Sequence, residues 1–283
     1  MSNKIKITCD STCDLPQELY AKYDVGIAPL SVALGEDLHQ DGVDLSTEML
    51  FAYVKQTGTL PKTSAVSMGE YLDLFGKYTA EGYTVIHINL SSQLSASHQN
   101  AVLAAQELGN VYVVDSRNLS SGSGHLVIEA AEMAAQGLDA ETIVAQLNEM
   151  KERLDVSFVL QTLEYLQKGG RCSSVAALGA RALQLRPEIR VTDGGMGVGK
   201  KYRGSMEKSI LDYIRGRLEG RDDIDTHRIF VTHSPMDPEM VTRAIALVKE
   251  LHPFEEVIET NAGCTICSHC GPNCLGVLFF KKA

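Results

Sequence analysis

The sequence contains no tryptophan, and aromatic residues make up only 6% of its 283 positions. Because 44% of the residues are hydrophobic, a core can still form, but it must be built mainly from aliphatic side chains. At about 150 residues per domain, this length suggests two domains.

Long apolar runs are also missing. No stretch approaches the ~18 apolar residues of a membrane span, and the opening MSNKIKITCDST has no apolar region after its lysines, as a secretion signal would. The seven cysteines are an odd number, and without a secretion signal they favour thiols or metal ligands over a disulfide framework. These features predict a cytoplasmic protein with no transmembrane segment.

Positive charge is scarce. The formal net charge of -10 argues against a nucleic-acid partner, because phosphate binding depends on clustered Lys and Arg that release counterions. An anionic ligand would therefore need a local site that offsets the repulsion from the net negative charge of the chain.

Common catalytic and nucleotide motifs are absent as well. Neither GxSxG nor HExxH occurs. The segment DGGMGVGK has phosphate-loop spacing, but Lys201 stands where Ser or Thr would reach magnesium, and both flanks are strand-like. Gly122-Ser123-Gly124 does not extend to GxGxxG, because position 127 is Val. We expect no nucleotide site, no cofactor, and no independent enzyme that uses Ser and His as nucleophile and base.

Strands and helices alternate through the first half of the chain, which predicts a parallel sheet with right-handed crossovers. Residues 83–90 are almost continuously apolar, as in a strand covered on both faces. Expected strands are 4–9, 26–34, 83–90 and 111–115; expected helices follow Pro16 and span 46–56, 67–80, 97–108, 124–136 and 140–154.

The second half mixes a hairpin with strand–helix units. Expected strands are 156–160, 188–192, 199–203, 228–233, 257–260 and 276–281, with helices at 162–168, 206–218 and 238–251. The predicted fold class is α/β. An N-terminal three-layer α/β/α domain with a parallel sheet would span residues 1–155, and a smaller C-terminal α/β domain with a mixed sheet would span 156–283.

Cys264, Cys267, Cys270 and Cys274 form C-x2-C-x2-C-x3-C, a spacing found around iron–sulfur clusters. Leu275 replaces the proline that follows such a run in ferredoxins, and no second run supplies the partner cluster. Zinc could use the same thiolates. A metal or redox protein therefore stays open as an alternative to reduced thiols in a tight loop.

Hydroxyl side chains gather in four groups, three of them after expected strands and one after Leu60-Pro61. They are Ser11 and Thr12; Thr63, Ser64 and Ser67; Ser91, Ser92, Ser95 and Ser97; and Ser116, Ser120, Ser121 and Ser123. Any one group is explained by helix capping. Because the carboxyl ends of parallel strands share one edge, where ligands of open α/β sheets bind, four groups together suit an anionic head group.

These groups lie in segments that resemble the DegV family. The matching segments are Asp10-Ser11-Thr12 with Leu15-Pro16 (DST-x-DLP), Pro29-Leu30-x-Val32, Pro61-Lys62-Thr63-Ser64 (P-x-TSQPS), Ser91-Ser92-x-Leu94-Ser95 (SSxLSGTYQSA), Asp115-Ser116, Leu166-Gln167-Lys168-Gly169-Gly170-Arg171 (L-x-KGGR), Arg203-Gly204 and His269-Cys270-Gly271-Pro272 (H-x-GPG). They run from residue 10 to residue 276 in the family's order. Residues 65–66 and 96–98 depart from the family pattern.

The resemblance implies a carrier that holds one long-chain fatty acid in a buried apolar tunnel and is not itself an enzyme. It implies that Thr63 and Ser95 hydrogen-bond the carboxylate, that Ser64 and Ser92 lie nearby, and that Arg171 and His269 approach from the second domain. Some family members are binding subunits of a bacterial fatty acid kinase. The expected partner is therefore a separate ATP-dependent kinase that converts the carboxylate to an acyl phosphate.

Overall fold

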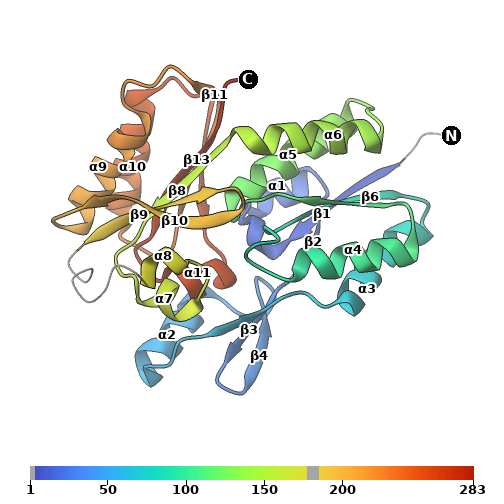
Figure 1. Ribbon diagram of the computed structural model, residues 1–283, viewed down its shortest axis with the longest axis horizontal. Coiled ribbons are helices and arrows are strands. Elements are labelled where there is room, and N and C mark those ends of the chain that lie inside the picture. The colour runs from blue at the N-terminus through green and yellow to red at the C-terminus, as the bar shows by residue number, and fades with distance from the viewer. Residues whose placement is uncertain (1–3, 177–184) are drawn as a thin grey trace.

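The computed structural model describes residues 4–176 and 185–283. Two sheets lie side by side with helices around them, and a small third sheet projects from one edge (Figure 1). No helix in the described ranges is both long enough and apolar enough to cross a lipid bilayer. The α/β fold class predicted from the alternating pattern is confirmed.

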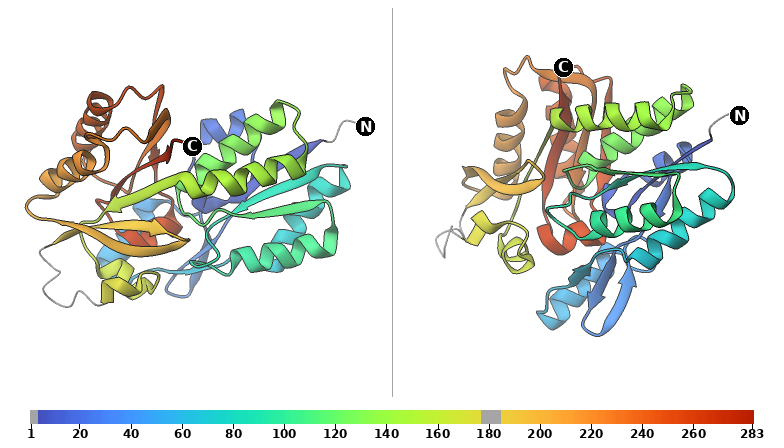
Figure 2. Two further views of the ribbon diagram at one scale, coloured as in Figure 1. Left: turned by 45° about the horizontal axis from the view of Figure 1, so that its top comes forward. Right: turned by 45° about the vertical axis from the view of Figure 1, so that its right-hand side comes forward.

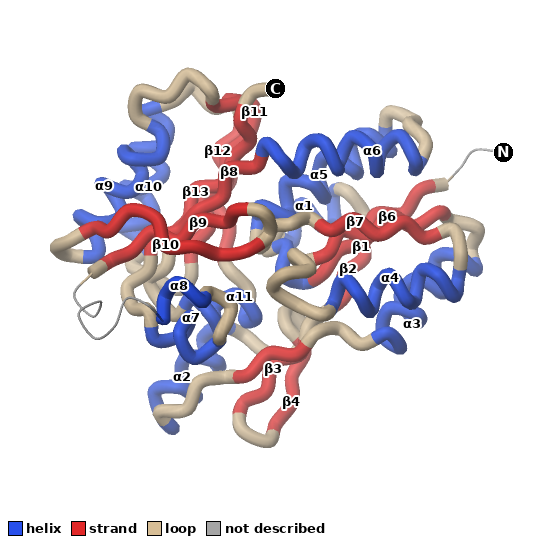
Figure 3. Tube along the Cα trace, viewed as in Figure 1, coloured by secondary structure: helices blue, strands red, loops and turns tan. Residues whose placement is uncertain are grey.

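The first sheet is parallel and has the order β2-β1-β6-β7. Its strands are β1 (Ile5–Asp10), β2 (Gly26–Ala28), β6 (Thr84–Asn89) and β7 (Val111–Asp115). One face carries α3 (Met68–Ala80) and α4 (Ser97–Leu108); the other carries α1 (Gln17–Lys22), α5 (Ser121–Ala135) and α6 (Ala140–Met150) (Figure 3). These are the three layers expected for the N-terminal half.

Strand β6 shows how the sequence specifies the layers. Val85 packs into the core on the α3 and α4 side, whereas Ile86 and Ile88 pack into the core on the α5 and α6 side. A strand whose side chains alternate between two buried faces needs apolar residues at both, which explains its nearly continuous apolar run.

The second sheet has six strands in the order β10-β9-β8-β13-β11-β12 and is mixed, since only β11 and β12 are parallel. Its strands are β8 (Leu154–Val159), β9 (Arg186–Thr192), β10 (Gly195–Tyr202), β11 (Ile224–His233), β12 (Glu256–Asn261) and β13 (Leu275–Lys281). The glycine-rich segment forms the β9–β10 hairpin turn, with Asp193 and Gly194 at positive φ. The mixed sheet is confirmed.

Helices α9 (Met206–Leu218) and α10 (Pro238–Leu251) cover the face of the second sheet that is turned away from the first (Figure 2). The opposite face meets α5, whose Leu126 and Ile128 share one core with Phe230, Leu278 and Phe280 of the second sheet. The two halves of the chain are therefore joined through an apolar interface.

The expected single strand 26–34 is wrong. Pro29 has no N–H to donate to a neighbouring strand. The next N–H, that of Leu30, donates to Ser11 Oγ at 3.1 Å and not to the sheet. The chain therefore leaves the parallel sheet after β2 and enters a small antiparallel sheet of the order β4-β3-β5, made of β3 (Ser31–Leu34), β4 (Asp37–Gln40) and β5 (Lys62–Ser64). Strands β4 and β5 were not predicted.

The expected helix 140–154 ends early. Helix α6 stops at Met150, a single 3-10 turn follows at Lys151–Arg153, and β8 starts at Leu154. The proposed division after residue 155 thus falls inside the first strand of the second sheet. After β8 come α7 (Glu164–Gly169) and the short α8 (Ser173–Ala176).

The cysteine-rich segment is a helix, α11 (Cys264–Cys270), and not the expected tight loop. It packs against α7, α2 (Thr47–Thr57), β3 and β5, so it connects both halves. The Asp41 carboxylate accepts the N–H groups of Cys264 at 2.8 Å and Thr265 at 3.2 Å, while Asp14 accepts that of Gly263 at 2.9 Å. Two carboxylates from the first half thus satisfy the free N–H groups at the start of α11.

Candidate functional site

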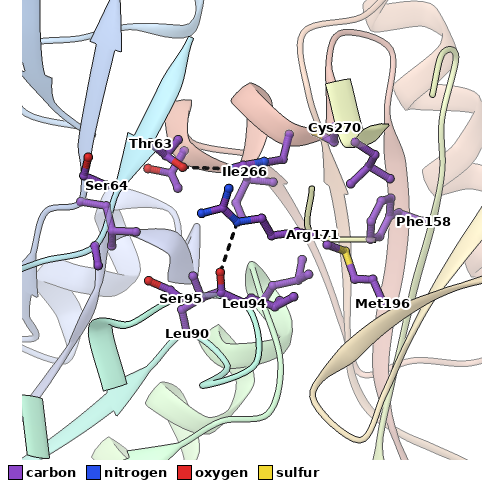
Figure 4. A pocket seen from close by; sticks show the side chains of 16 residues that line it. Thr63, Ser64, Leu90, Leu94, Ser95, Phe158, Arg171, Met196, Ile266 and Cys270 are labelled. Carbon is purple, nitrogen blue, oxygen red and sulfur yellow. Dashed lines mark hydrogen bonds between the residues drawn. The ribbon is translucent and has the colours of Figure 1, made fainter. Parts of the chain in front are cut away.

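A cleft opens where β5, the loop after β6, Arg171, β10 and α11 meet. Its empty space is about 570 Å³ when the open region at its mouth is included. Its apolar wall consists of Leu30, Ala65, Leu90, Leu94, Leu119, Phe158, Leu166, Met196 and Ile266. In Figure 4, Thr63 and Ser64 lie on one side of the cleft, Phe158 and Cys270 on the opposite side, and Arg171 between them.

The polar side of the cleft is organised by Thr63 and His269. Their Oγ1 and Nε2 atoms form a hydrogen bond of 2.8 Å across 206 residues of sequence (Figure 4). Burial first, and the nearby Arg171 charge second, lower the pKa of His269 to about 4. The imidazole is therefore neutral at pH 7, and with its proton on Nε2 it donates to Thr63 and leaves the threonine hydroxyl free to donate to an anion.

The position of His269 depends on a glycine. A Cβ added at Gly169, the last residue of α7, would lie 2.4 Å from His269 Nδ1 and 3.1 Å from its Cε1. The Gly-Gly pair at the end of α7 therefore has two functions, because Gly170 ends the helix at positive φ while Gly169 makes room for the imidazole ring. The KGGR motif contains both glycines, but nothing in the sequence indicates that Gly169 faces His269.

Ser95 and Ser64 complete the hydroxyl lining. Ser95 Oγ lies 2.9 Å from Ser97 Oγ and accepts the Ser97 N–H at 3.2 Å, so it sits at the start of α4. Ser64 ends β5 and is exposed to solvent. Strand β5 carries Thr63 and Ser64, and the turn before α4 carries Ser95, so two elements place three hydroxyls in the wall of the cleft.

Arg171 supplies the positive charge. Its Nη1 donates to Gly169 O at 2.7 Å and its Nε to Leu94 O at 3.5 Å, the latter a long contact. These bonds hold the side chain across the cleft and leave other guanidinium N–H groups available. An anion near Thr63 would therefore gain a cationic neighbour despite the net charge of the chain.

Five of the six residues expected at the site line the cleft: Thr63, Ser64, Ser95, Arg171 and His269. Ser92 is not brought to the cleft wall. Its N–H donates to Asp115 Oδ1 at 3.2 Å, and its side chain hydrogen-bonds the same carboxyl and helps to lower its pKa. Ser92 therefore links the loop after β6 to the end of β7.

Most other hydroxyls of the four groups hold the fold together. Ser67 caps α3, Ser91 Oγ donates to Gly194 O at 2.7 Å, and Ser116 and Ser123 pair at 2.8 Å. Ser121 hydrogen-bonds Thr232 of the second sheet. Three of the groups follow β1, β6 and β7 of the parallel sheet, whereas Thr63 and Ser64 lie in β5 of the small antiparallel sheet. Among all four groups, only Thr63, Ser64 and Ser95 line the cleft.

Thr265 was missed by sequence reasoning. It lies on α11 in the cleft wall, is only 3% exposed, and its hydroxyl has no hydrogen-bond partner among the described residues. A buried hydroxyl without a partner is unfavourable by about 1–3 kcal/mol, so a polar atom of a ligand or a water molecule fits beside it. No sequence signal marked Thr265, because α11 itself was expected to be a loop.

Cys264 is separated from Cys270 and Cys274 by the geometry of α11. Cys264 points to Leu45 O, in a different core cluster from Cys270 and Cys274. Among the residues described, no group of three or more His, Cys, Asp or Glu side chains is arranged to hold a metal ion. The metal alternative therefore has no support in the described geometry.

A cleft lined by three hydroxyls, a neutral histidine, an arginine and several aliphatic side chains suits an amphipathic anion. The polar groups can orient a carboxylate, and the apolar wall can bury a hydrocarbon chain. The apolar wall was not predicted residue by residue, because its members come from β8, β10, α7, α11 and the loops of the first sheet.

Comparison with known proteins agrees with this description. The DegV family model matches residues 4–282. A DegV domain-containing protein of Clostridium acetobutylicum is 31% identical, with 99% of each chain covered. A DegV family protein of Thermus thermophilus described as fatty acid binding is 30% identical, with a TM-score of 0.87 over 98% of this chain and 99% of that one. A stearic-acid-binding protein of Eubacterium ventriosum is 26% identical, with a TM-score of 0.88 over 98% of both chains. The chain belongs to the DegV family.

Proposed function

We propose that this protein binds one long-chain fatty acid in the cleft, with the carboxylate at Thr63, Ser95 and Ser64 and the hydrocarbon chain against the apolar wall. The observation that carries the proposal is the division of one cleft into a hydroxyl-lined side and an aliphatic side. Arg171 and His269, from the second half of the chain, approach the same head group. The described function of the Thermus and Eubacterium relatives supports this assignment.

The two ends of the ligand would contribute differently. A tail of about a dozen methylenes gives on the order of 10 kcal/mol gross, at ~0.8 kcal/mol each, before the unfavourable entropy of association. Two or three hydroxyl hydrogen bonds contribute about 1–3 kcal/mol each. The apolar wall therefore determines affinity, and the hydroxyls determine where the carboxylate points.

We further propose that the bound carboxylate is presented to a separate ATP-dependent kinase, which forms the acyl phosphate. Phosphoryl transfer depends on positioning and charge neutralisation, so nucleotide and magnesium can belong to the partner. The exposure of Ser64 leaves an approach to the head group from solvent. The carrier would contribute Thr63 and Ser95 to hold the carboxylate and Arg171 to balance the negative charge that accumulates there.

Native mass spectrometry of freshly purified protein tests the binding step. The expected result is an added mass equal to one fatty acid that is released on denaturation and is replaced when a labelled fatty acid is added. A protein that neither carries nor takes up a fatty acid contradicts the proposal. Acyl-phosphate formation by a purified fatty acid kinase, with and without this protein, then tests the presenting step.

A further inference from the structure

A second cavity, which shares no lining residue with the cleft, opens where strands β8 and β9 separate. Strand β8 pairs with β9 at residues 157–159, although β8 continues along β13 to Leu154 and β9 continues along β10 to Thr192. Residues 154–156 and 191–192 lie on either side of this gap and line the cavity. Its empty space is about 770 Å³ when the open region at its mouth is included.

The first half of the chain supplies the remaining part of the wall. Arg117 and Asn118 come from the loop between β7 and α5, and Lys151 and Glu152 come from the turn after α6. The cavity therefore lies between the two halves of the chain, and both contribute polar side chains to it.

The wall is more positive than the protein as a whole. It carries five cationic side chains and three acidic ones, whereas the chain has a net charge of -10. Glu188 is not part of the wall but pairs with Arg190 at 2.8 Å and with Arg217 at 3.4 Å. An excess of positive charge remains even when Glu188 is counted, so the cavity can attract an anion that the rest of the surface repels.

Arg117 is held only by exposed acids. Its guanidinium pairs with Glu152 at 3.0 Å and with Asp193 at 3.5 Å, and these carboxylate side chains are 56% and 77% exposed. Ion pairs with solvent-exposed partners contribute little to stability. A ligand anion in the cavity can therefore replace either carboxylate on Arg117 at little cost to the fold.

Two buried side chains in the wall have polar atoms without a partner. Arg217 is 6% exposed and pairs with Asp155 and Glu188, but its Nε has no hydrogen-bond partner among the described residues. Asn118 is 5% exposed, and its Oδ1 is likewise without a partner in the described part of the chain. Buried polar atoms are normally hydrogen-bonded, so these two indicate that something else binds here.

Lys281 adds a free positive charge. Its backbone oxygen accepts from Arg153, but its ammonium makes no hydrogen bond or ion pair with any residue that the structure describes. The cavity thus offers a free ammonium and a buried N–H donor for anionic oxygens, together with a buried acceptor at Asn118. A single water molecule could satisfy one of these atoms, but it would not neutralise the positive charge.

We propose that this cavity binds a small phosphate monoester that carries hydroxyl groups. The phosphate oxygens accept from Arg217 Nε and the Lys281 ammonium, and a hydroxyl of the ligand donates to Asn118 Oδ1. A phosphate monoester has close to two negative charges at pH 7 and three acceptor oxygens, which matches several cations better than a carboxylate does. The inference does not depend on the proposed function, because the fatty acid cleft is a different cavity.

Isothermal titration calorimetry of the full chain with ribose 5-phosphate, in a low-salt buffer without phosphate, tests the proposal. We expect saturable binding of one molecule per chain, weaker binding of inorganic phosphate and no binding of ribose. Lys281→Gln should lower the affinity about tenfold, because it removes one charged donor. Lys282→Gln is the matched control, since it removes the same charge from an exposed neighbour outside the cavity wall and should leave the affinity unchanged.

NMR of the wild-type protein locates the site even if a variant does not fold. Addition of ribose 5-phosphate should shift the Arg217 Nε–H signal and the backbone amide signals of Asn118 and Thr192, and should leave fatty acid affinity unchanged. The absence of saturable binding, an equal effect of the two lysine variants, or shifts confined to the fatty acid cleft would overturn the inference. Inorganic phosphate that binds as tightly as ribose 5-phosphate would overturn the role of Asn118 and the requirement for a hydroxyl.

Discussion

Gly169 and His269 are in such close contact that a Cβ on the glycine would lie 2.4 Å from the imidazole Nδ1. The contact joins α7 to α11 within the second half of the chain, and the other ring nitrogen of the same histidine reaches Thr63 in the first half at 2.8 Å. The imidazole is therefore fixed from both sides, and its place in the cleft depends on a missing side chain.

Gly169→Ala should displace the imidazole and break the Thr63 hydrogen bond. We expect fatty acid affinity to fall about tenfold, which corresponds to the loss of about one oriented hydrogen bond. Isothermal titration calorimetry with a delipidated protein measures the effect. Gly76→Ala is the control, since Gly76 also lies in a helix, α3, and a Cβ there meets nothing within 4 Å. Equal affinities for both variants would contradict the role given to Gly169.

His269 should also make the protein sensitive to acid. Its pKa in the folded state is about 4, below the ~6.5 of an exposed histidine. Between these two pH values the unfolded chain binds the proton and the folded chain does not, so stability should fall as the pH drops through this window. His125, with a pKa of about 3, contributes in the same direction.

The share of His269 can be isolated with two variants. In His269→Gln, the free energy of unfolding in urea should depend less on pH between about 6.5 and 4 than in the wild type, while the His125 contribution remains. In Arg171→Gln, the NMR titration midpoint of His269 should rise, because the arginine charge lowers its pKa. A midpoint that does not move would show that burial alone sets the pKa.

Asp41 holds the helix that carries the thiols and the histidine. It accepts two N–H groups at the start of α11 and is 3% exposed. Asp41→Ala should reduce the free energy of unfolding by about 1–3 kcal/mol, because buried donors lose their acceptor. Asp37→Ala, at an exposed position of β4 nearby in sequence, should change it little. Equilibrium urea denaturation compares the two, and equal losses would argue against this capping role.

The fold could be predicted largely from periodicity because its main elements are long and strongly patterned. Helices α4, α9 and α10 have the predicted bounds, and each expected strand apart from 26–34 corresponds to one observed strand. The errors occur where a local cue was weak: Pro29 separates two short strands, and β4 carries mostly exposed polar residues. Helix α11 is short and has no long apolar face, and its cysteine spacing led to the prediction of a tight loop.

The site was predicted unevenly for a related reason. Thr63, Ser95, Arg171 and His269 lie in motifs that a family resemblance can identify, and the structure gathers them in one cleft. Ser92 lies in the same motif as Ser95 but points to Asp115, since neighbouring residues in a loop need not share a direction. Gly169 is important because it lies against His269, and Thr265 because it lines the cleft. Both depend on residues distant in sequence, which a local sequence pattern cannot indicate.

The head-group assignment itself is tested by removing the two hydroxyls. Thr63→Ala with Ser95→Ala should lower fatty acid affinity by about ten- to a hundredfold, the effect of losing one or two hydrogen bonds, since the apolar wall still holds the tail. At saturating fatty acid, where weaker binding no longer limits the rate, acyl-phosphate formation by the kinase should still fall, and by a larger factor than the affinity does. The reason is that a misdirected carboxylate cannot reach the phosphoryl donor.

Ser92→Ala is the matched control, because it removes a hydroxyl from the same loop as Ser95 without altering the cleft wall. It should leave both affinity and turnover close to those of the wild type. Circular dichroism and the urea midpoint show whether the double variant keeps its fold. If the folded double variant supports normal turnover at saturation, the carboxylate lies elsewhere, and Arg171 with His269 becomes the head-group site to examine. If Ser92→Ala lowers turnover more than the double variant does, the kinase contacts the surface near Asp115.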